Sequence, residues 1–199
     1  MSDNTKGFRG AVFIDRDGTV SEEVGYVNHI SRFRLLPTVP EAILELNKHN
    51  IPAVVTTNQA GVARGYFKEN LINVIHSKMI SILAEHGAKL LDVYYCPHHP
   101  TAGEPPYRQD CDCRKPKTGL LMRASREHNI DLSSSYVIGD KWTDVEFGHR
   151  AGANSILVLT GYGIGEWEDK EKHLDRQPEF VAQNLLDAVK WIISRVEGQ

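Results

Sequence analysis

The sequence predicts an α/β fold with a Rossmann-like parallel sheet flanked by helices. The apolar runs are strand-sized and rich in β-branched residues, they alternate with helical apolar patterns, and polar residues follow most of them. Strands that alternate with helices need crossover connections, so the sheet should be mostly parallel and covered on both faces. The predicted strands are residues 11–14, 53–57, 91–95, 136–138 and 155–160.

Helices are expected between and after these strands. Residues 39–46 carry apolar side chains at helical spacing after Thr38, which suits an N-cap, and Pro40 suits the first turn. The apolar pattern of residues 71–83 ends shortly before Gly87, which is typical of a helix C-terminus. Similar patterns predict helices over residues 120–128, 145–151 and 185–193.

The composition is that of an ordinary globular protein. Of 199 residues, 41% are hydrophobic and 25% are charged, which argues against disorder. We expect one domain over residues 1–199, with an irregular loop inserted at residues 96–113.

The net charge of −3 provides no basic field for nucleic acid. No apolar run is long enough for a membrane helix and no signal peptide is visible, so we expect a cytoplasmic protein that does not bind membrane. We also expect a monomer that does not bind nucleic acid.

Carboxylates follow two of the predicted strands. Asp15 and Asp17 come after the first strand, and Asp140 follows Gly139 at the end of the fourth. The carboxyl ends of parallel strands meet at one edge of the sheet, where ligands bind. Crowded carboxylates repel one another, and Mg²⁺, which prefers oxygen ligands, relieves that repulsion. An isolated Asp-x-Asp-Gly is as readily a surface turn, but two strands that both end in acidic motifs favour a magnesium site.

The order and spacing of four segments resemble the motifs of the haloacid dehalogenase superfamily. The segments are Asp15-x-Asp-Gly-Thr, Thr57-Asn58, Lys115 and Gly139-Asp-x-x-x-Asp144. The resemblance implies that Asp15 is the nucleophile that accepts a phosphoryl group, which a carboxylate can do by forming an acyl phosphate. Asp17 can protonate the leaving oxygen and later activate water. Dehalogenases and ATPases of the superfamily lack the second aspartate, so a phosphatase is favoured.

Other residues of these motifs can neutralise the transferred phosphoryl group. The Thr57 hydroxyl, backbone N–H groups near Asn58 and the Lys115 ammonium suit the negative charge on its oxygens. Each residue alone would be an ordinary strand end or a solvated lysine. Asp144 is expected to support the metal site without binding the metal, and Lys141 to form an ion pair with a site carboxylate.

A cysteine–histidine constellation lies in the predicted loop. Three cysteines and one histidine make a Cys₃His set, which is typical of a structural zinc site; the candidates are Cys96, His98, Cys111 and Cys113. Spacing alone does not separate His98 from His99. The alternatives are buried cysteines without metal and a catalytic cysteine, for which no base is apparent. A zinc ion would fold this loop and fix Arg114 and Lys115 beside the phosphate site.

Longer segments resemble a small, nearly capless branch of the superfamily that acts on sugar bisphosphates. They are Gly25-Tyr-Val, Thr57-Asn-Gln-Ala-Gly-Val-Ala-Arg-Gly, Tyr95-Cys-Pro-His-His-Pro, Cys111-Asp-Cys-Arg-Lys-Pro and Gly139-Asp-Lys. This resemblance implies an enzyme that removes the 7-phosphate of a heptose 1,7-bisphosphate during synthesis of nucleotide-activated heptose for the lipopolysaccharide core.

The same resemblance assigns residues to roles. Mg²⁺ would be held by Asp15, Asp140 and the main-chain carbonyl of Asp17, and Zn²⁺ by the three cysteines and His98. Arg114 would recognise the second phosphate, which a guanidinium can bind through two parallel hydrogen bonds. The implied substrate- and phosphate-binding residues are Glu23, Val24, Gly25, Tyr26, Thr57, Asn58, Gln59, Ala60, Arg114, Lys115 and Lys141.

Two other functions compete with this one. Similar capless phosphatases act on histidinol phosphate or on 3′-phosphate ends of DNA, although the acidic charge and the lack of an aromatic–basic stripe disfavour DNA. The fold could also serve a non-catalytic metal-binding module. The presence of both Asp15 and Asp17 argues against that module.

Overall fold

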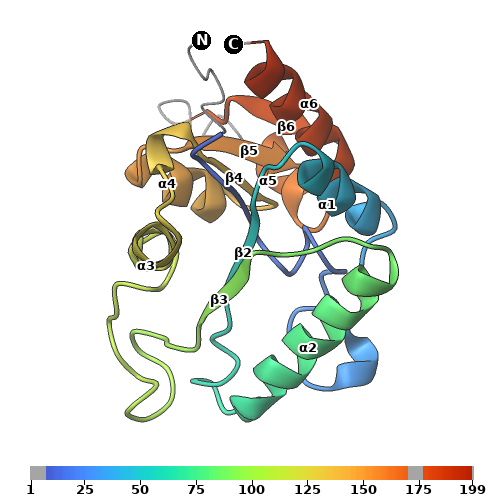
Figure 1. The fold of residues 1–199 in the computed structure, drawn as a ribbon. Coiled ribbons are helices and arrows are strands. Elements are labelled where there is room, and N and C mark those ends of the chain that lie inside the picture. Colours follow the sequence, from blue (N-terminus) through green and yellow to red (C-terminus); the bar gives the residue numbers. More distant parts are fainter. Residues whose placement is uncertain (1–7, 170–176, 199) are drawn as a thin grey trace.

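The protein is built on a six-stranded parallel sheet with helices on both faces (Figure 1). The computed structural model describes residues 8–169 and 177–198. The strand order is β3-β2-β1-β4-β5-β6, and every neighbouring pair is parallel. The strands are β1 (Val12–Ile14), β2 (Ala53–Asn58), β3 (Asp92–Cys96), β4 (Tyr136–Gly139), β5 (Asn154–Val158) and β6 (Phe180–Ala182). Five of these strands were predicted, and the three-residue β6 was not.

The predicted helices form close to their expected bounds. They are α1 (Val39–Lys48), α2 (Asn70–Glu85), α3 (Gly119–His128), α4 (Trp142–Arg150) and α6 (Leu185–Glu197). The short α5 (Gly163–Glu168) and 3₁₀ turns at Ile30–Arg32 and Leu132–Ser134 were not predicted. Thr38 occupies the N-cap position of α1 but makes no side-chain capping hydrogen bond. Gly87 follows α2 with a φ of +73°, as expected for a helix C-terminus.

Alternating side chains of the strands face two different layers of helices. Val12 and Ile14 are fully buried in a core shared with α1, α2 and α6, whereas Phe13 is fully buried against α3 and α4. Figure 1 shows α1 and α6 on one side of the sheet and α3 and α4 on the other. Because each such side chain contributes roughly 1.5–3 kcal/mol by its burial, the central strands form a rigid base for the residues that follow them.

The central strands bring the predicted motifs to one edge of the sheet. β1 lies between β2 and β4, and its register pairs Ile14 with Val55 on one side and Ile138 on the other. The N–H of Asp15 donates to the carbonyl of Ile138 at 2.8 Å, so the pairing continues into the first motif. The carboxyl ends of β1, β2 and β4 are therefore adjacent, at the place where ligands bind in open α/β sheets.

Among the described residues, no helix is long and apolar enough to cross a bilayer.

Candidate active site

A polar cavity of about 90 Å³ lies at the carboxyl ends of the central strands. Its lining includes eight residues predicted from the sequence: Asp15, Asp17, Glu23, Gly25, Thr57, Asn58, Lys115 and Lys141. Thr143 and Asp144 also line it. The cavity is the size of a phosphate group with a few waters, and segments far apart in the sequence converge there.

Lys115 is the central cation of this cavity. Its ammonium lies 2.5 Å from Oδ1 of Asp15 and 2.6 Å from Oδ1 of Asp144, and it also donates to the carbonyl of Thr56 at 3.1 Å. All of these groups are buried. Burial lowers the pKa of Lys115, but the two carboxylates outweigh burial and raise it, so the lysine stays charged. Asp144, expected only to support a metal site, is therefore a direct partner of Lys115.

Asp140 completes a group of carboxylates that could hold a cation. It is fully buried, Oδ2 accepts the N–H of Tyr162 at 2.9 Å, and Oδ1 has no hydrogen-bond partner among the described residues. Oxygens of Asp15, Asp140 and Asp144 all lie within 4.8 Å of one another. A Cβ atom on Gly18 would collide with the Asp140 carboxylate, so only glycine leaves room for it. An oxygen-only donor set in which one buried oxygen accepts no hydrogen bond fits a hard divalent cation such as Mg²⁺.

The electrostatics of this group agree with that fit. Burial raises the pKa of Asp15 to about 6, with the neighbouring Asp144 adding to the rise and Lys115 opposing it. Burial, followed by the charge of Asp15, raises the pKa of Asp140 to about 7. Both carboxyl groups therefore titrate close to neutral pH, and a bound cation would favour their ionised forms.

The Asp17 carboxylate has hydrogen-bond partners of its own. The Arg16 guanidinium donates to both of its oxygens at 3.0 and 2.7 Å, and Gln59 Nε2 and Ser21 Oγ donate to it at 2.8 and 3.3 Å. Burial raises the pKa of Asp17, but the Arg16 charge and these hydrogen bonds lower it below its usual value. The side chain of Arg16 is itself fully buried and meets Nε2 of His76 on α2 at 3.3 Å.

Gln59 and Asn58 have roles that the sequence did not reveal. Gln59 bridges Asp17 and Thr57, donating to the Thr57 hydroxyl oxygen at 2.9 Å. The side-chain amide of Asn58 donates to the carbonyl of Lys115 at 3.2 Å and accepts the N–H of Lys115 at 3.1 Å. Asn58 is among the residues expected to bind phosphate, and its side chain holds the backbone of Lys115. Motif matching gave no information about this contact.

The loop after β1 supplies another wall of the cavity. Glu23 accepts the Gly25 N–H at 2.6 Å and the Lys141 ammonium at 3.1 Å, which confirms an ion pair between Lys141 and a site carboxylate. Lys141 also lies 3.8 Å from Oδ1 of Asp140. Its pKa is raised because these carboxylates outweigh the effect of burial.

The remaining predicted residues lie around the cavity without lining it. Tyr26 is 39% exposed and packs edge-to-face on Tyr66, with ring centroids 4.7 Å apart. Val24 packs against the core, and Ala60 is buried in the turn after β2. The Arg114 guanidinium donates to the carbonyl of His98 at 3.3 Å.

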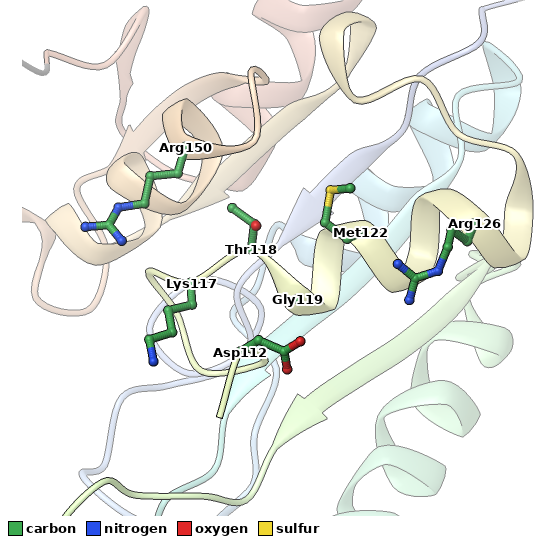
Figure 2. Close-up of a pocket in the computed structure, with 7 residues that line it drawn as sticks. All are labelled: Asp112, Lys117, Thr118, Gly119, Met122, Arg126 and Arg150. Carbon is green, nitrogen blue, oxygen red and sulfur yellow. The ribbon is translucent and has the colours of Figure 1, made fainter. Parts of the chain in front are cut away.

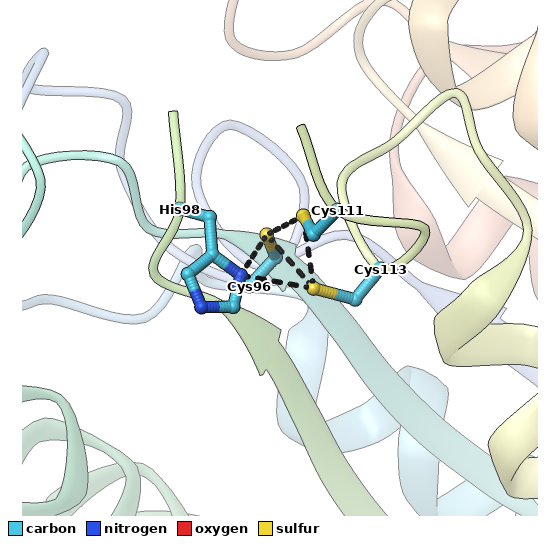
Figure 3. A group of neighbouring side chains, drawn as sticks. All are labelled: Cys96, His98, Cys111 and Cys113. Atoms are coloured by element: carbon cyan, nitrogen blue, oxygen red, sulfur yellow. Dashed lines mark hydrogen bonds between the residues drawn. The ribbon is translucent and has the colours of Figure 1, made fainter. Parts of the chain in front are cut away.

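The cysteine–histidine constellation forms a compact cluster (Figure 3). The sulfur atoms of Cys96, Cys111 and Cys113 lie 3.2–3.5 Å apart, and Nδ1 of His98 lies 3.3 Å from Cys113 and 3.7 Å from Cys96. Zn–S bonds of about 2.3 Å put tetrahedral ligands roughly 3.8 Å apart, so the cluster needs little expansion to hold zinc. His99 lies outside the cluster. The cluster ends at Cys113, two residues before the catalytic-cavity lysine.

Two other groups of polar side chains have most of their charges paired with neighbouring residues. Asp92, Glu127 and His128 lie together, but hydrogen bonds from Arg123, Tyr94 and the Val93 N–H occupy the carboxylates, and His128 contacts Asp92. A hollow of about 420 Å³ lies at the start of α3. Figure 2 shows the residues that line it: Asp112, Lys117, Thr118, Gly119, Met122, Arg126 and Arg150. Two of its three cations already pair with Asp110 and Glu146.

Known proteins are similar to this chain in sequence and in fold. Residues 112–188 match a family model described as "HAD-hyrolase-like". A D-glycero-beta-D-manno-heptose-1,7-bisphosphate 7-phosphatase of Pasteurella multocida is 42% identical over 183 residues, covering 92% of this chain and 96% of that protein. The corresponding protein of Photorhabdus laumondii is 45% identical over 165 residues, covering 82% and 88%. The crystal structure of a D,D-heptose 1,7-bisphosphate phosphatase from B. bronchiseptica, complexed with magnesium and phosphate, has a TM-score of 0.83 at 29% identity and covers 94% of this chain and 99% of that chain.

The sheet, its acidic cavity and these relatives define a phosphatase of the haloacid dehalogenase superfamily, that is, an enzyme that hydrolyses phosphoric monoesters. Within that class the sequence relationships are more specific, because they extend over most of both chains at more than 40% identity. The chain belongs to the family of D-glycero-β-D-manno-heptose-1,7-bisphosphate 7-phosphatases.

Proposed function

We propose that this enzyme removes the 7-phosphate of D-glycero-D-manno-heptose 1,7-bisphosphate. The observation that carries the proposal is the buried pair of Asp15 and Lys115, 2.5 Å apart in a phosphate-sized cavity, in a chain whose relatives bear that activity in their names. The pair supplies a nucleophile and a cation at one point.

The first half of the reaction uses Asp15 as the nucleophile. A carboxylate oxygen of Asp15 attacks phosphorus, the bond from phosphorus to the sugar O7 breaks, and an aspartyl phosphate forms. Lys115 and Thr57 line the cavity, so their ammonium and hydroxyl would face the phosphoryl oxygens, where preorganised charge and hydrogen bonds stabilise the transition state. A proton from Asp17 then completes the sugar hydroxyl, which requires that Asp17 enter this step protonated.

The second half returns the enzyme to its starting state. Water attacks phosphorus, gives a proton to Asp17, and releases inorganic phosphate and the Asp15 carboxylate. The hydrogen bonds from Arg16 and Gln59 favour the ionised form of Asp17, which is the form that accepts this proton. Gln59 also connects Asp17 to Thr57, so the base and one phosphate ligand are positioned together.

The two candidate metal sites have different roles in this proposal. Asp15, Asp140 and the main-chain carbonyl of Asp17 would hold Mg²⁺, which supplies positive charge against the incoming phosphate. Cys96, His98, Cys111 and Cys113 would hold Zn²⁺ in a closed site with no position left for substrate. The zinc would stabilise the loop that carries Arg114 and Lys115.

The test is phosphate release with Mg²⁺ from a panel of substrates. The panel comprises both anomers of heptose 1,7-bisphosphate, fructose 1,6-bisphosphate, histidinol phosphate and a 3′-phosphorylated oligonucleotide. We expect the highest kcat/KM with one heptose anomer. A preference for histidinol phosphate or the oligonucleotide would contradict the proposed substrate, and no turnover of any substrate by the metal-loaded protein would contradict a phosphatase.

A further inference from the structure

Two arginines beside the catalytic cavity lack an acidic partner. Arg64 is exposed on the turn after β2, and Arg114 lies in the loop after the metal cluster. Arg114 donates only to a backbone carbonyl, and the contact of Arg64 is to an imidazole. Within residues 8–169 and 177–198 neither guanidinium lies within ion-pair distance of a carboxylate, which leaves both free to bind an anion.

His99 adds a third donor between these two arginines. Its Nδ1 accepts hydrogen bonds from the backbone N–H groups of Thr101 at 3.2 Å and Ala102 at 2.9 Å. A backbone amide always donates, so Nδ1 carries no proton and the neutral ring must carry its proton on Nε2. Nε2 lies 2.9 Å from Nη2 of Arg64.

The contact between Arg64 and His99 therefore places two donors face to face. Neither group can satisfy the other, because Arg64 has no lone pair and Nε2 has a proton in place of one. Arg114 approaches the same residue through the carbonyl of His98, which belongs to the peptide group that joins His98 to His99. An anion at this point would accept hydrogen bonds from all three side chains and remove the conflict.

The site adjoins the catalytic cavity. The backbone of Gly103 packs so tightly on that of Ala63 that a Cβ atom there would collide, so the turn that carries Arg64 is fixed against the loop that carries His99. Gly61 of the same turn packs on Tyr26, the neighbour of the cavity-lining Gly25. Arg114 directly precedes the cavity-lining Lys115.

The resemblance already implies that Arg114 recognises the second phosphate. We propose that Arg64 and the Nε2–H of His99 join Arg114 there and bind the phosphate of the bisphosphate that is not hydrolysed. The inference rests on the proposed function and extends it, since Arg64 becomes a residue that determines specificity for a doubly phosphorylated sugar. A guanidinium can bind a phosphate through two parallel hydrogen bonds, and a phosphate would give both Arg64 and His99 the acceptor that each lacks in their mutual contact.

The test compares Arg64→Ala and Arg64→Lys with the wild type on two substrates, heptose 1,7-bisphosphate and heptose 7-phosphate, which lacks the second phosphate. We expect Arg64→Ala to lower kcat/KM for the bisphosphate about 10- to 100-fold, mainly through KM, and to change that for the monophosphate less than about twofold. Arg64→Lys should restore part of the loss. Heptose 1-phosphate, the product, should inhibit Arg64→Ala about tenfold more weakly than the wild type.

Arg126→Ala is the matched control, because Arg126 is an exposed arginine on α3, away from the cavity, and should leave both substrates unaffected. Equal kcat/KM of Arg64→Ala and wild type on the bisphosphate, with the wild type preferring it over the monophosphate, would overturn this inference and leave the proposed function intact. Equal losses on both substrates would also overturn it. A wild type without preference for the bisphosphate would overturn the proposed function as well.

Discussion

The ammonium of Lys115 lies 2.5 Å from Oδ1 of Asp15, although 100 positions separate the two residues in the sequence. The contact is possible because Asp15 follows β1 and the end of the metal-cluster loop passes over the end of β2. The same ammonium lies 2.6 Å from Asp144, and Lys141 lies 3.8 Å from Asp140, so two lysines face three clustered carboxylates. In the proposed mechanism a divalent cation would offset the remaining negative charge when a phosphate enters.

Removing the central cation should harm both stability and activity. Lys115→Met leaves Asp15 and Asp144 buried without a partner, and we expect a loss of about 3 kcal/mol in the free energy of unfolding. We also expect turnover to fall at least about 100-fold, since the phosphoryl group loses its fixed cation. Urea denaturation and phosphate release measure these effects. Lys117→Met, which breaks a surface pair with Asp110, is the control and should change little; equal effects of the two variants would contradict the assigned role.

Asn58 should act through the backbone of Lys115. Asn58→Ala removes both hydrogen bonds to that backbone, and we expect kcat to fall about 10-fold or more because the ammonium is no longer held in place. Asn58→Asp keeps the acceptor for the Lys115 N–H but loses the donor, and should not restore activity. Wild-type kcat in Asn58→Ala would show that the lysine needs no such support.

The cysteine cluster should bind zinc and stabilise the loop. Cys113→Ala removes one of four ligands, so we expect zinc content to fall from one ion per chain to near zero and Tm to fall by at least about 4 °C. Elemental analysis and calorimetry measure these quantities. Asp112→Asn, between the two cysteines, should keep the metal. A Cys113→Ala variant with unchanged zinc and Tm would mean that these cysteines hold no metal.

His76 should make the protein acid-sensitive. Burial, helped by the charge of Arg16, lowers its pKa to about 3. Because the unfolded chain takes up the proton near pH 6.5 and the folded chain does not, the contribution of His76 to stability is complete above that pH and is lost as the pH falls toward 3. His76→Gln keeps an acceptor for Arg16 but cannot titrate. The wild type should therefore lose up to about 1.4 kcal/mol more per pH unit than this variant between pH 6 and 4.5; parallel urea-denaturation series would contradict this.

Residues at the carboxyl ends of strands were the most predictable part of the molecule. Asp15 and Thr57 could be assigned to the carboxyl ends of strands because short apolar runs rich in β-branched residues indicate buried strands. The carboxyl ends of parallel strands lie at one edge of the sheet, so these residues were expected to lie near each other. The clustering of three cysteines with a histidine was predictable because such a set within a short loop is typical of a metal site. β6 could not be predicted, since it has only three residues and its strand character comes from pairing with β5.

The contacts between motifs were not predictable. The sequence indicates that Asn58 and Lys115 belong to the site but not that the side chain of one holds the backbone of the other. Arg16 lies between two motif aspartates in the sequence, and nothing there indicates that its side chain is fully buried and meets His76. Such contacts depend on how loops of different strands meet, and no local pattern encodes that meeting.

The most direct test of the account is to trap the phosphorylated enzyme and locate the modified residue. The enzyme is mixed with heptose 1,7-bisphosphate and Mg²⁺, reduced with borohydride, which converts an aspartyl phosphate to homoserine, and digested for mass spectrometry. We predict homoserine at position 15 in the wild type, and neither homoserine nor turnover in Asp15→Asn. Full turnover by Asp15→Asn, or homoserine at another aspartate, would contradict the account.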